Sequence, residues 1–234
     1  MELQAIHLLM TFRCLLECDH CFVWGSPRQR TTVTLDRIEE VIRQAAELGT
    51  VEWFYFEGGE PFLYYPVLVE AVQRALAAGF KVGIVTNGYW ATSVEDAAHW
   101  LTPLAGRVSD LSVSSDAYHD SSEGDSTSDH ARDAAERLGI PHGVISIAAP
   151  EEMGVASGAG TLPSGLSGVM FRGRAAERLA DRAPRRSWRL LTECPHEDLK
   201  SSDRVHVDPT GHVHLCQGIS LGNVFRDSLS SICS

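Results

Sequence analysis

Short apolar runs alternate with amphipathic helical segments along most of the chain, and this alternation restricts the fold more than any other feature of the sequence. The strand-like runs cover residues 3–10, 51–56, 81–86, 108–114 and 144–148, with a sixth at 168–171. The helical patterns between them cover residues 35–48, 67–78, 94–104 and 130–138. Such an alternation is typical of βαβ units and a parallel sheet. We therefore expect an α/β fold whose chemistry lies at the carboxyl ends of the strands.

Two polar segments, residues 121–129 and 153–167, interrupt this pattern. We interpret them as surface connections. Closure over a bound substrate is the alternative, because long loops in compact domains are often lids.

Charge and hydropathy exclude several classes of protein. The net charge is −11, with 20 Lys and Arg against 31 Asp and Glu, which argues against sequence-independent binding of nucleic acid. A basic stretch at residues 172–189 is interpreted as a solvated helix face. The chain has neither a long apolar run that would span a membrane nor a secretory signal at its start, so we expect a cytoplasmic protein.

Three cysteines, Cys14, Cys18 and Cys21, follow the first expected strand in a C-x3-C-x2-C arrangement. Three thiolates this close in sequence can hold three irons of a cubane cluster and leave the fourth iron open to another ligand. A zinc site is the alternative, with His20 or a distant cysteine as its fourth ligand.

The position of this cysteine loop, together with a Gly-Gly-Glu-Pro sequence after the second strand, resembles the radical S-adenosylmethionine (SAM) superfamily. The resemblance covers roughly residues 3–180 and includes a Thr-Asn-Gly sequence after the third strand and a Gly-Arg-Ala sequence near residue 174. It implies a partial (β/α)6 TIM-like barrel and a [4Fe-4S] cluster on the three cysteines. The residues that it implies contact SAM are His20, Gly58, Gly59, Glu60, Pro61, Asn87, Ser114 and Arg172, with Arg174 as the alternative to Arg172. The arginine could instead face the substrate or form a surface ion pair.

Two roles within this set follow from the resemblance in more detail. The Gly58–Pro61 segment resembles the motif that binds the methionine amino group, and His20 takes the place of an aromatic residue beside the adenine. Asp116 and His119 are expected either to shape the active site or to form a helix start or a turn.

Roughly the last 40 residues do not continue the alternation of strands and helices. Residues 205–216 predict a β-hairpin, with Asp-Pro-Thr-Gly as its turn. Together with Cys194, Cys216 and Cys233 this segment resembles the start of a SPASM or Twitch extension, which binds auxiliary iron–sulfur clusters. We therefore divide the chain into a core domain, residues 1–190, and an extension, residues 191–234, which we expect to be incomplete.

Three interpretations of the last cysteines stay open. They could hold an auxiliary iron–sulfur cluster, either with an open site or with His212 or His214 as a fourth ligand. Alternatively, Cys194, Cys216 and a histidine could form a zinc site, or the segment could be a remnant that binds no cluster.

The resemblance implies an enzyme that cleaves SAM reductively to a 5′-deoxyadenosyl radical, which then abstracts hydrogen from a substrate. It also implies an electron donor such as flavodoxin or ferredoxin. The SPASM-like tail favours a ribosomally made peptide as substrate, although only 13 residues precede Cys14, which argues against a leader-binding domain there. A small molecule of cofactor or natural-product biosynthesis is the alternative. A zinc-stabilised, non-catalytic binding module is the alternative from another class.

Overall fold

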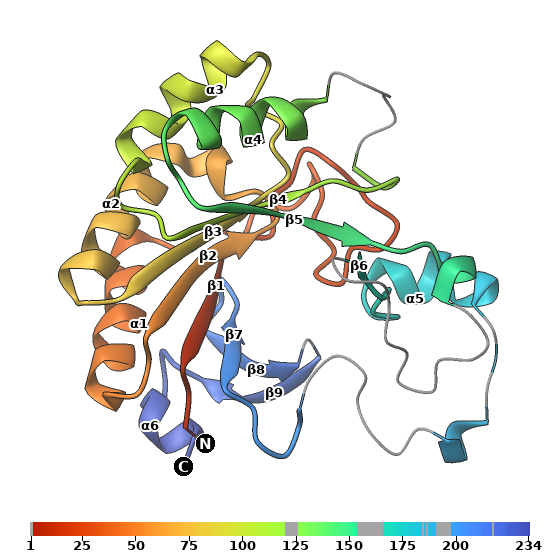
Figure 1. The fold of residues 1–234 in the computed structure, drawn as a ribbon. Coiled ribbons are helices and arrows are strands. Elements are labelled where there is room, and N and C mark those ends of the chain that lie inside the picture. The colour runs from red at the N-terminus through yellow and green to blue at the C-terminus, as the bar shows by residue number, and fades with distance from the viewer. Residues whose placement is uncertain are drawn as a thin grey trace.

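The computed structural model describes residues 2–119, 126–153, 166–183, 185, 187–190, 198–216 and 218–234. Within them a nine-stranded sheet forms the centre of the molecule (Figure 1). Its strands are β1 (Ala5–Thr11), β2 (Trp53–Gly58), β3 (Lys81–Thr86), β4 (Asp110–Ser114), β5 (His142–Ile147), β6 (Leu166–Ser167), β7 (Arg204–Val207), β8 (His212–Cys216) and β9 (Ile219–Asn223). Their order across the sheet is β6-β5-β4-β3-β2-β1-β7-β8-β9.

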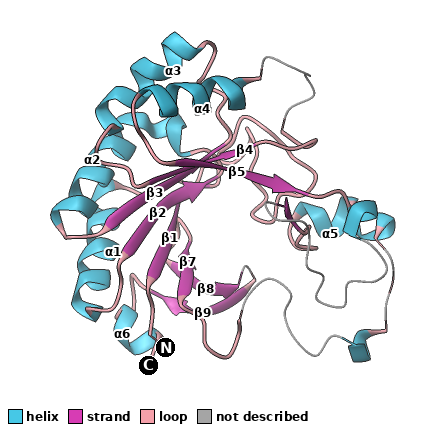
Figure 2. Ribbon diagram, viewed as in Figure 1, coloured by secondary structure: helices cyan, strands magenta, loops and turns pink. Residues whose placement is uncertain are grey.

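Helices cover the outer face of this sheet (Figure 2). The helices are α1 (Leu35–Leu48), α2 (Tyr65–Ala77), α3 (Val94–Leu101), α4 (Thr127–Arg137), α5 (Arg174–Arg178) and α6 (Leu229–Ile232). The short 3-10 helices are η1 (Pro61–Tyr64), η2 (Thr102–Leu104), η3 (Pro150–Met153), η4 (Ala180–Arg182) and η5 (Trp188–Leu190). No helix among the described residues is long and apolar enough to cross a membrane.

The expected α/β architecture with a parallel sheet is confirmed. Strands β1 to β6 pair in parallel, and each neighbouring pair from β1 to β5 is joined by a helix on the outer face. Successive side chains of a strand point to opposite faces. Ile6, Leu8 and Met10 of β1 are buried in the main hydrophobic core, whereas His7 and Leu9 line a cavity on the inner face.

Two expected boundaries were wrong. The sixth strand is short and ends at Ser167, because the chain turns after it and the N–H of Arg172 donates to the carbonyl of Met170 (2.7 Å). Helix α4 begins within the segment that we interpreted as a loop, since the Ser126 hydroxyl accepts a hydrogen bond from Asp129 N (3.2 Å) and caps it. The rest of that segment, and most of residues 153–167, lie outside the described residues.

The expected C-terminal hairpin is present as β7 and β8, and it continues the main sheet. Strand β7 pairs in parallel with β1, so His206 lies beside His7, and β8 returns antiparallel to β7. The hairpin turn is held by the Asp208 carboxylate, which accepts hydrogen bonds from the N–H groups of Thr210 (2.8 Å) and His212 (3.1 Å). Strand β1 of the expected core domain thus pairs with β7 of the expected extension as well as with β2. The proposed division into two domains at residues 190 and 191 stays a prediction.

A buried glutamine ties the end of the chain to the first helix. Gln44 on α1 donates from Nε2 to the carbonyl of Val224 (3.0 Å), and its Oε1 accepts from Leu229 N (2.7 Å) at the start of α6. Both backbone groups follow the hairpin, so one side chain satisfies a buried donor and a buried acceptor.

Replacement of Gln44 by alanine is therefore expected to lower the free energy of unfolding by about 1–3 kcal/mol, because each backbone group would lose its partner. Urea unfolding of the anaerobically purified protein measures this change. Gln73→Ala, at an exposed position of α2, is the matched control and should change it by less than about 0.5 kcal/mol. Equal effects of the two substitutions would contradict the role given to Gln44.

Candidate active site

The three cysteines of the N-terminal motif lie in the loop that follows β1, at the carboxyl end of the sheet. Backbone hydrogen bonds fold this loop back on itself: Cys14 N donates to Ser26 O (3.1 Å) and Cys21 N to Cys18 O (3.1 Å). The Cys21 sulfur accepts a hydrogen bond from Gly25 N (3.2 Å). All three cysteines line one cavity, with Cys14 buried and the other two partly buried.

The electrostatics of the loop favour a bound cation. Burial raises the pKa of Cys14 to about 11 and that of Cys18 to about 12, and the neighbouring thiols add to both shifts. With pKa values this high, Cys14 and Cys18 stay protonated near neutral pH unless a positive charge compensates their thiolates, and a coordinated metal supplies that charge. The donor set of three sulfurs with an open side towards the cavity fits an iron–sulfur cluster that keeps one iron open.

The two glycines of the Gly-Gly-Glu-Pro sequence are required by contacts within the protein itself. A Cβ at Gly58 would lie 2.5 Å from the carbonyl oxygen of Thr11, and a Cβ at Gly59 would lie 2.1 Å from that of Arg13. The N–H of Gly59 donates to Thr11 O (2.6 Å) and that of Glu60 to Arg13 O (2.9 Å). The end of β2 thus clamps the start of the cysteine loop, a role that the motif alone does not reveal.

Glu60 is fully buried, and both of its carboxylate oxygens have partners. Oε1 accepts from Phe62 N (3.0 Å) and from the Thr86 hydroxyl (2.9 Å), and Oε2 accepts from Asn87 N (2.8 Å). Burial raises the pKa of Glu60 to about 7, although these hydrogen bonds lower it in part. The carboxylate joins the ends of β2 and β3 behind the cavity, and its contact with SAM stays a prediction, as does that of Pro61.

Asn87 follows β3 and lies between this carboxylate and the cysteine loop. Its Nδ2 donates to Cys14 Sγ (3.5 Å), and its Oδ1 accepts from Tyr89 N (3.0 Å). Asn87 lines the cavity, as do Gly58, Gly59 and Ser114 at the end of β4. Four of the expected SAM residues are therefore gathered around one opening, and their contacts with the cofactor remain predictions.

His20 also lines the cavity. Its ring lies 4.7 Å from the Tyr118 ring and 5.0 Å from that of His119, and burial lowers its pKa to about 4. His20 is therefore neutral at pH 7, and its buried Nδ1 has no hydrogen-bond partner within the protein. Ligand atoms of Cys18, His20 and His119 lie within 4.8 Å of one another, so the zinc alternative also has a local set of donors.

Asp116 fixes the histidines of this wall. Its Oδ1 accepts from Tyr118 N (2.9 Å) and lies 2.8 Å from His119 Nδ1, while Oδ2 accepts from Ile147 N (3.1 Å) on β5. Burial opposes ionisation, but His119 holds the pKa of Asp116 below its usual range. Asp116 therefore holds the turn at Tyr118 and the position of the His119 ring, and a role of either residue in catalysis stays a prediction.

The Gly-Arg-Ala sequence braces the cysteine loop from the other side. Arg174 is 3% exposed and donates from Nη1 to Cys18 O (2.8 Å) and from Nη2 to Gly25 O (2.6 Å), and its N–H donates to Cys21 O (3.0 Å). A Cβ at Gly173 would lie 2.7 Å from Cys21 O. The Gly-Arg-Ala motif was the only sequence feature that drew attention to Arg174. From it we expected a contact with SAM or substrate and not these hydrogen bonds to the cysteine loop.

Replacement of Arg174 by methionine keeps the aliphatic bulk of the side chain and removes its donors, so it should leave two loop carbonyls without partners. We expect a loss of about 3 kcal/mol in the free energy of unfolding and a lower iron content after reconstitution, because the loop that presents Cys18 and Cys21 is no longer held. Arg178→Met on the same helix is the control, since Arg178 forms an exposed ion pair with Asp19 worth less than about 1 kcal/mol. Iron analysis of both variants distinguishes the loss of the hydrogen bonds from Arg174 to the cysteine loop from the loss of a surface charge. Equal iron contents in the two variants would contradict the role given to Arg174.

Arg172 and the remaining cysteines lie elsewhere. The Arg172 guanidinium donates to the sulfur of Cys216 at the end of β8. Cys233 is buried in the main hydrophobic core. Among the described residues, neither Cys216 nor Cys233 belongs to a group of three ligand residues, and Cys194 lies outside those residues. The SAM contact of Arg172 and the auxiliary metal site therefore stay predictions.

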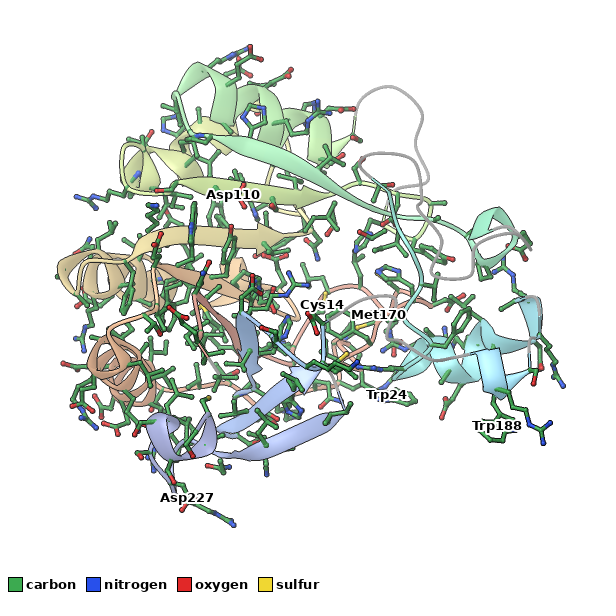
Figure 3. The ribbon with its side chains drawn as sticks, turned by 60° about the horizontal axis from the view of Figure 1, so that its bottom comes forward. Cys14, Trp24, Asp110, Met170, Trp188 and Asp227 are labelled. Carbon is green, nitrogen blue, oxygen red and sulfur yellow. The ribbon has the colours of Figure 1, made fainter. Side chains whose placement is uncertain are left out.

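The cavity itself has a volume of about 670 Å³ and runs along the inner face of the sheet. Cys14 and Met170, which both line it, lie near the middle of the molecule in Figure 3, whereas Trp188 and Asp227 lie at its periphery. Away from the cysteines its wall is formed by His7, Tyr55, Glu57, Asp110 and His206, among others. Burial opposes ionisation of Glu57, but nearby His7 and His206 hold its pKa at about 2.

Comparison with known proteins places this site in a family. The family model of the radical SAM superfamily matches residues 8–145. The putative peptide biosynthesis protein YydG of Bacillus subtilis is 29% identical over 119 residues, which are 50% of this chain and 37% of that protein. The chain thus matches little more than a third of the length of this relative.

Two solved structures share the fold. SuiB of Streptococcus suis, in complex with the precursor peptide SuiA, matches with a TM-score of 0.56 and 13% identity over 99% of this chain and 65% of that one. BtrN, in complex with AdoMet and 2-DOIA, matches with a TM-score of 0.58 and 14% identity over 98% of this chain and 81% of that one. With the family model matching more than half of its residues, the chain belongs to the radical SAM superfamily.

Proposed function

We propose that this chain is a radical SAM enzyme that abstracts hydrogen from a ribosomally made peptide. The radical SAM family uses a [4Fe-4S] cluster and SAM, and the donor set of Cys14, Cys18 and Cys21 fits the cluster. When bound, the cluster supplies the electron that cleaves SAM to a 5′-deoxyadenosyl radical. The protein's own residues hold the loop, orient SAM and exclude water.

One observation carries this proposal: the cysteine loop and the ends of β2, β3 and β4 all line a single cavity. Gly58, Gly59 and Asn87 lie beside Cys14 in its wall, and Ser114 lines it from β4. Parallel strands that end at one edge are the usual place for such chemistry in this kind of fold. The backbone at the two glycines and the side chain of Asn87 would orient SAM.

The peptide substrate is supported by two similarities. YydG is described as a putative peptide biosynthesis protein, and SuiB was solved with a precursor peptide. A small molecule is the second candidate, since the cavity of about 670 Å³ has the size of a small-molecule site and BtrN was solved with 2-DOIA. A cytoplasmic electron donor such as flavodoxin or ferredoxin is part of the proposal.

The test is release of 5′-deoxyadenosine from SAM by anaerobically reconstituted protein with a strong reductant. The Cys14→Ala/Cys18→Ala/Cys21→Ala triple variant is the control. Release by the wild type and not by the triple variant supports the proposal. No release from wild-type protein with a reduced cluster, with or without peptide, contradicts it.

Substrate class is decided by a second readout. Unlabelled SAM is incubated with candidate precursor peptides that carry deuterium at every α and β carbon. The 5′-deoxyadenosine that is released is then analysed by mass spectrometry. Deuterium in the product identifies the peptide as the hydrogen source. Release without deuterium from any peptide, but with deuterium from a labelled small molecule, would favour the second candidate.

A further inference from the structure

We propose that His7, Glu57 and His206 form a binding site for a divalent transition-metal ion on the inner face of the sheet. The three side chains line the same cavity as the cysteine loop, and none belongs to that loop. The inference goes beyond the proposed function, because it depends neither on SAM nor on the identity of the substrate.

The register of the sheet places the three donors together. On neighbouring parallel strands, His7 of β1 is paired with His206 of β7 and with Tyr55 of β2. Glu57 lies two residues after Tyr55 on β2 and therefore points to the same face. Three adjacent strands thus present one ligand residue each to the cavity.

The distances suit coordination to one ion. His7 Nδ1 lies 3.3 Å from Glu57 Oε2, and His206 Nε2 lies 3.5 Å from Glu57 Oε1. One ligand atom from each of the three residues falls within 4.8 Å of the others. Ligands about 2.0–2.2 Å from a metal ion are spaced by roughly 3.0–3.5 Å in tetrahedral or octahedral geometry, so small side-chain movements would complete the site.

The donor chemistry selects the class of ion. Two imidazole nitrogens and one carboxylate oxygen are typical ligands of zinc and of other divalent transition metals, whereas magnesium and calcium prefer oxygen alone. Three protein ligands leave at least one coordination position open. Since all three residues face the cavity, that position is accessible to water or to an oxygen or nitrogen atom of a bound substrate.

The surroundings fix the ligands in place. The side chains of His7, Glu57 and His206 are only 13%, 14% and 11% exposed. The His7 ring stacks on that of Tyr55, with centroids 4.6 Å apart and planes 8° from parallel. Gly83 makes room for this stack, because a Cβ there would lie 2.1 Å from the Tyr55 ring. Outer groups that orient a histidine ring strengthen metal binding.

A hydrogen-bonded His–Glu–His group without an ion is the alternative explanation for the same geometry. The test therefore measures metal directly in the holoprotein. Protein with its reconstituted iron–sulfur cluster is dialysed anaerobically against zinc, and zinc per chain is determined by mass spectrometry. We expect one zinc per chain in the wild type, and an affinity lower by at least about tenfold in Glu57→Gln and in His206→Ala. His99→Ala, at an exposed position of α3 away from the cavity, is the matched control and should bind zinc as the wild type does.

Zinc X-ray absorption of the wild type identifies the ligands without any substitution, so the test stands even if a variant fails to fold. A shell of nitrogen and oxygen at about 2.0–2.1 Å with imidazole scattering supports the site. A shell containing sulfur at about 2.3 Å would assign the zinc to cysteines and overturn the proposal. Absence of bound zinc in the wild type, or unchanged affinity in both ligand variants, would overturn it as well.

Discussion

Replacement of Cys18 by alanine is expected to abolish the release of 5′-deoxyadenosine, whereas replacement of Cys216 should leave most of it. Cys18 is one of three sulfurs that the loop after β1 presents to the cavity, and a cubane cluster that loses a protein ligand is not held in the catalytic position. Cys216 lies at the end of β8 beside Arg172, and it does not line the described cavity.

Two measurements on the same samples check this contrast. Iron and sulfide analysis with electron paramagnetic resonance of the reduced protein reports the cluster, and 5′-deoxyadenosine formation reports the cleavage of SAM. The Cys18 variant should lose both signals, while the Cys216 variant should keep the signal of the cluster that cleaves SAM. Equal loss in the two variants would contradict the division into a primary site and a separate C-terminal cysteine.

Substitution of Gly59 by alanine should disrupt the cysteine loop and lower the stability of the protein strongly. The new Cβ would lie 2.1 Å from the carbonyl oxygen of Arg13, and the neighbouring atoms are backbone that cannot rotate away. The end of β2 and the start of the cysteine loop would have to separate. We expect a loss of about 3 kcal/mol or more in the free energy of unfolding, together with most of the bound iron.

Gly143→Ala provides the matched control. Gly143 lies on β5, its φ is not in the left-handed region, and a Cβ there would meet no atom within 4 Å. Its replacement should change stability by less than about 0.5 kcal/mol and leave the iron content unaltered. Urea unfolding and iron analysis measure both variants. Normal iron content in the Gly59 variant would show that the clamp is not needed to hold the loop.

The sequence predicts the local elements of this fold well, because their signals are local. The apolar run at residues 81–86 coincides with β3, and the helical pattern expected from residue 94 begins there as α3, where the Ser93 side chain accepts a hydrogen bond from Asp96 N (3.1 Å). The three closely spaced cysteines also lie in a single loop beside the cavity, as expected. Each of these features depends on residues within a few positions of one another.

Contacts between distant segments could not be predicted in this way. The pairing of β7 with β1 joins residues about 200 positions apart, and no periodicity in either strand indicates its partner. Arg174 was assigned to a ligand because its motif does not show that two loop carbonyls accept its hydrogen bonds. The grouping of His7, Glu57 and His206 had no sequence signal, since each histidine lies singly in an apolar strand.

The position of β7 beside β1 has a consequence for synthesis on the ribosome. Until residues 204–207 emerge, strand β1 has one edge with unpaired backbone groups, and such an edge can pair with other chains. The nascent protein therefore carries an aggregation-prone edge while the residues between β1 and β7 are translated, and it can bury that edge only by a contact of very long sequence separation, which forms slowly. Yield of the folded protein should consequently respond to chaperones and growth temperature more strongly than its final stability would suggest.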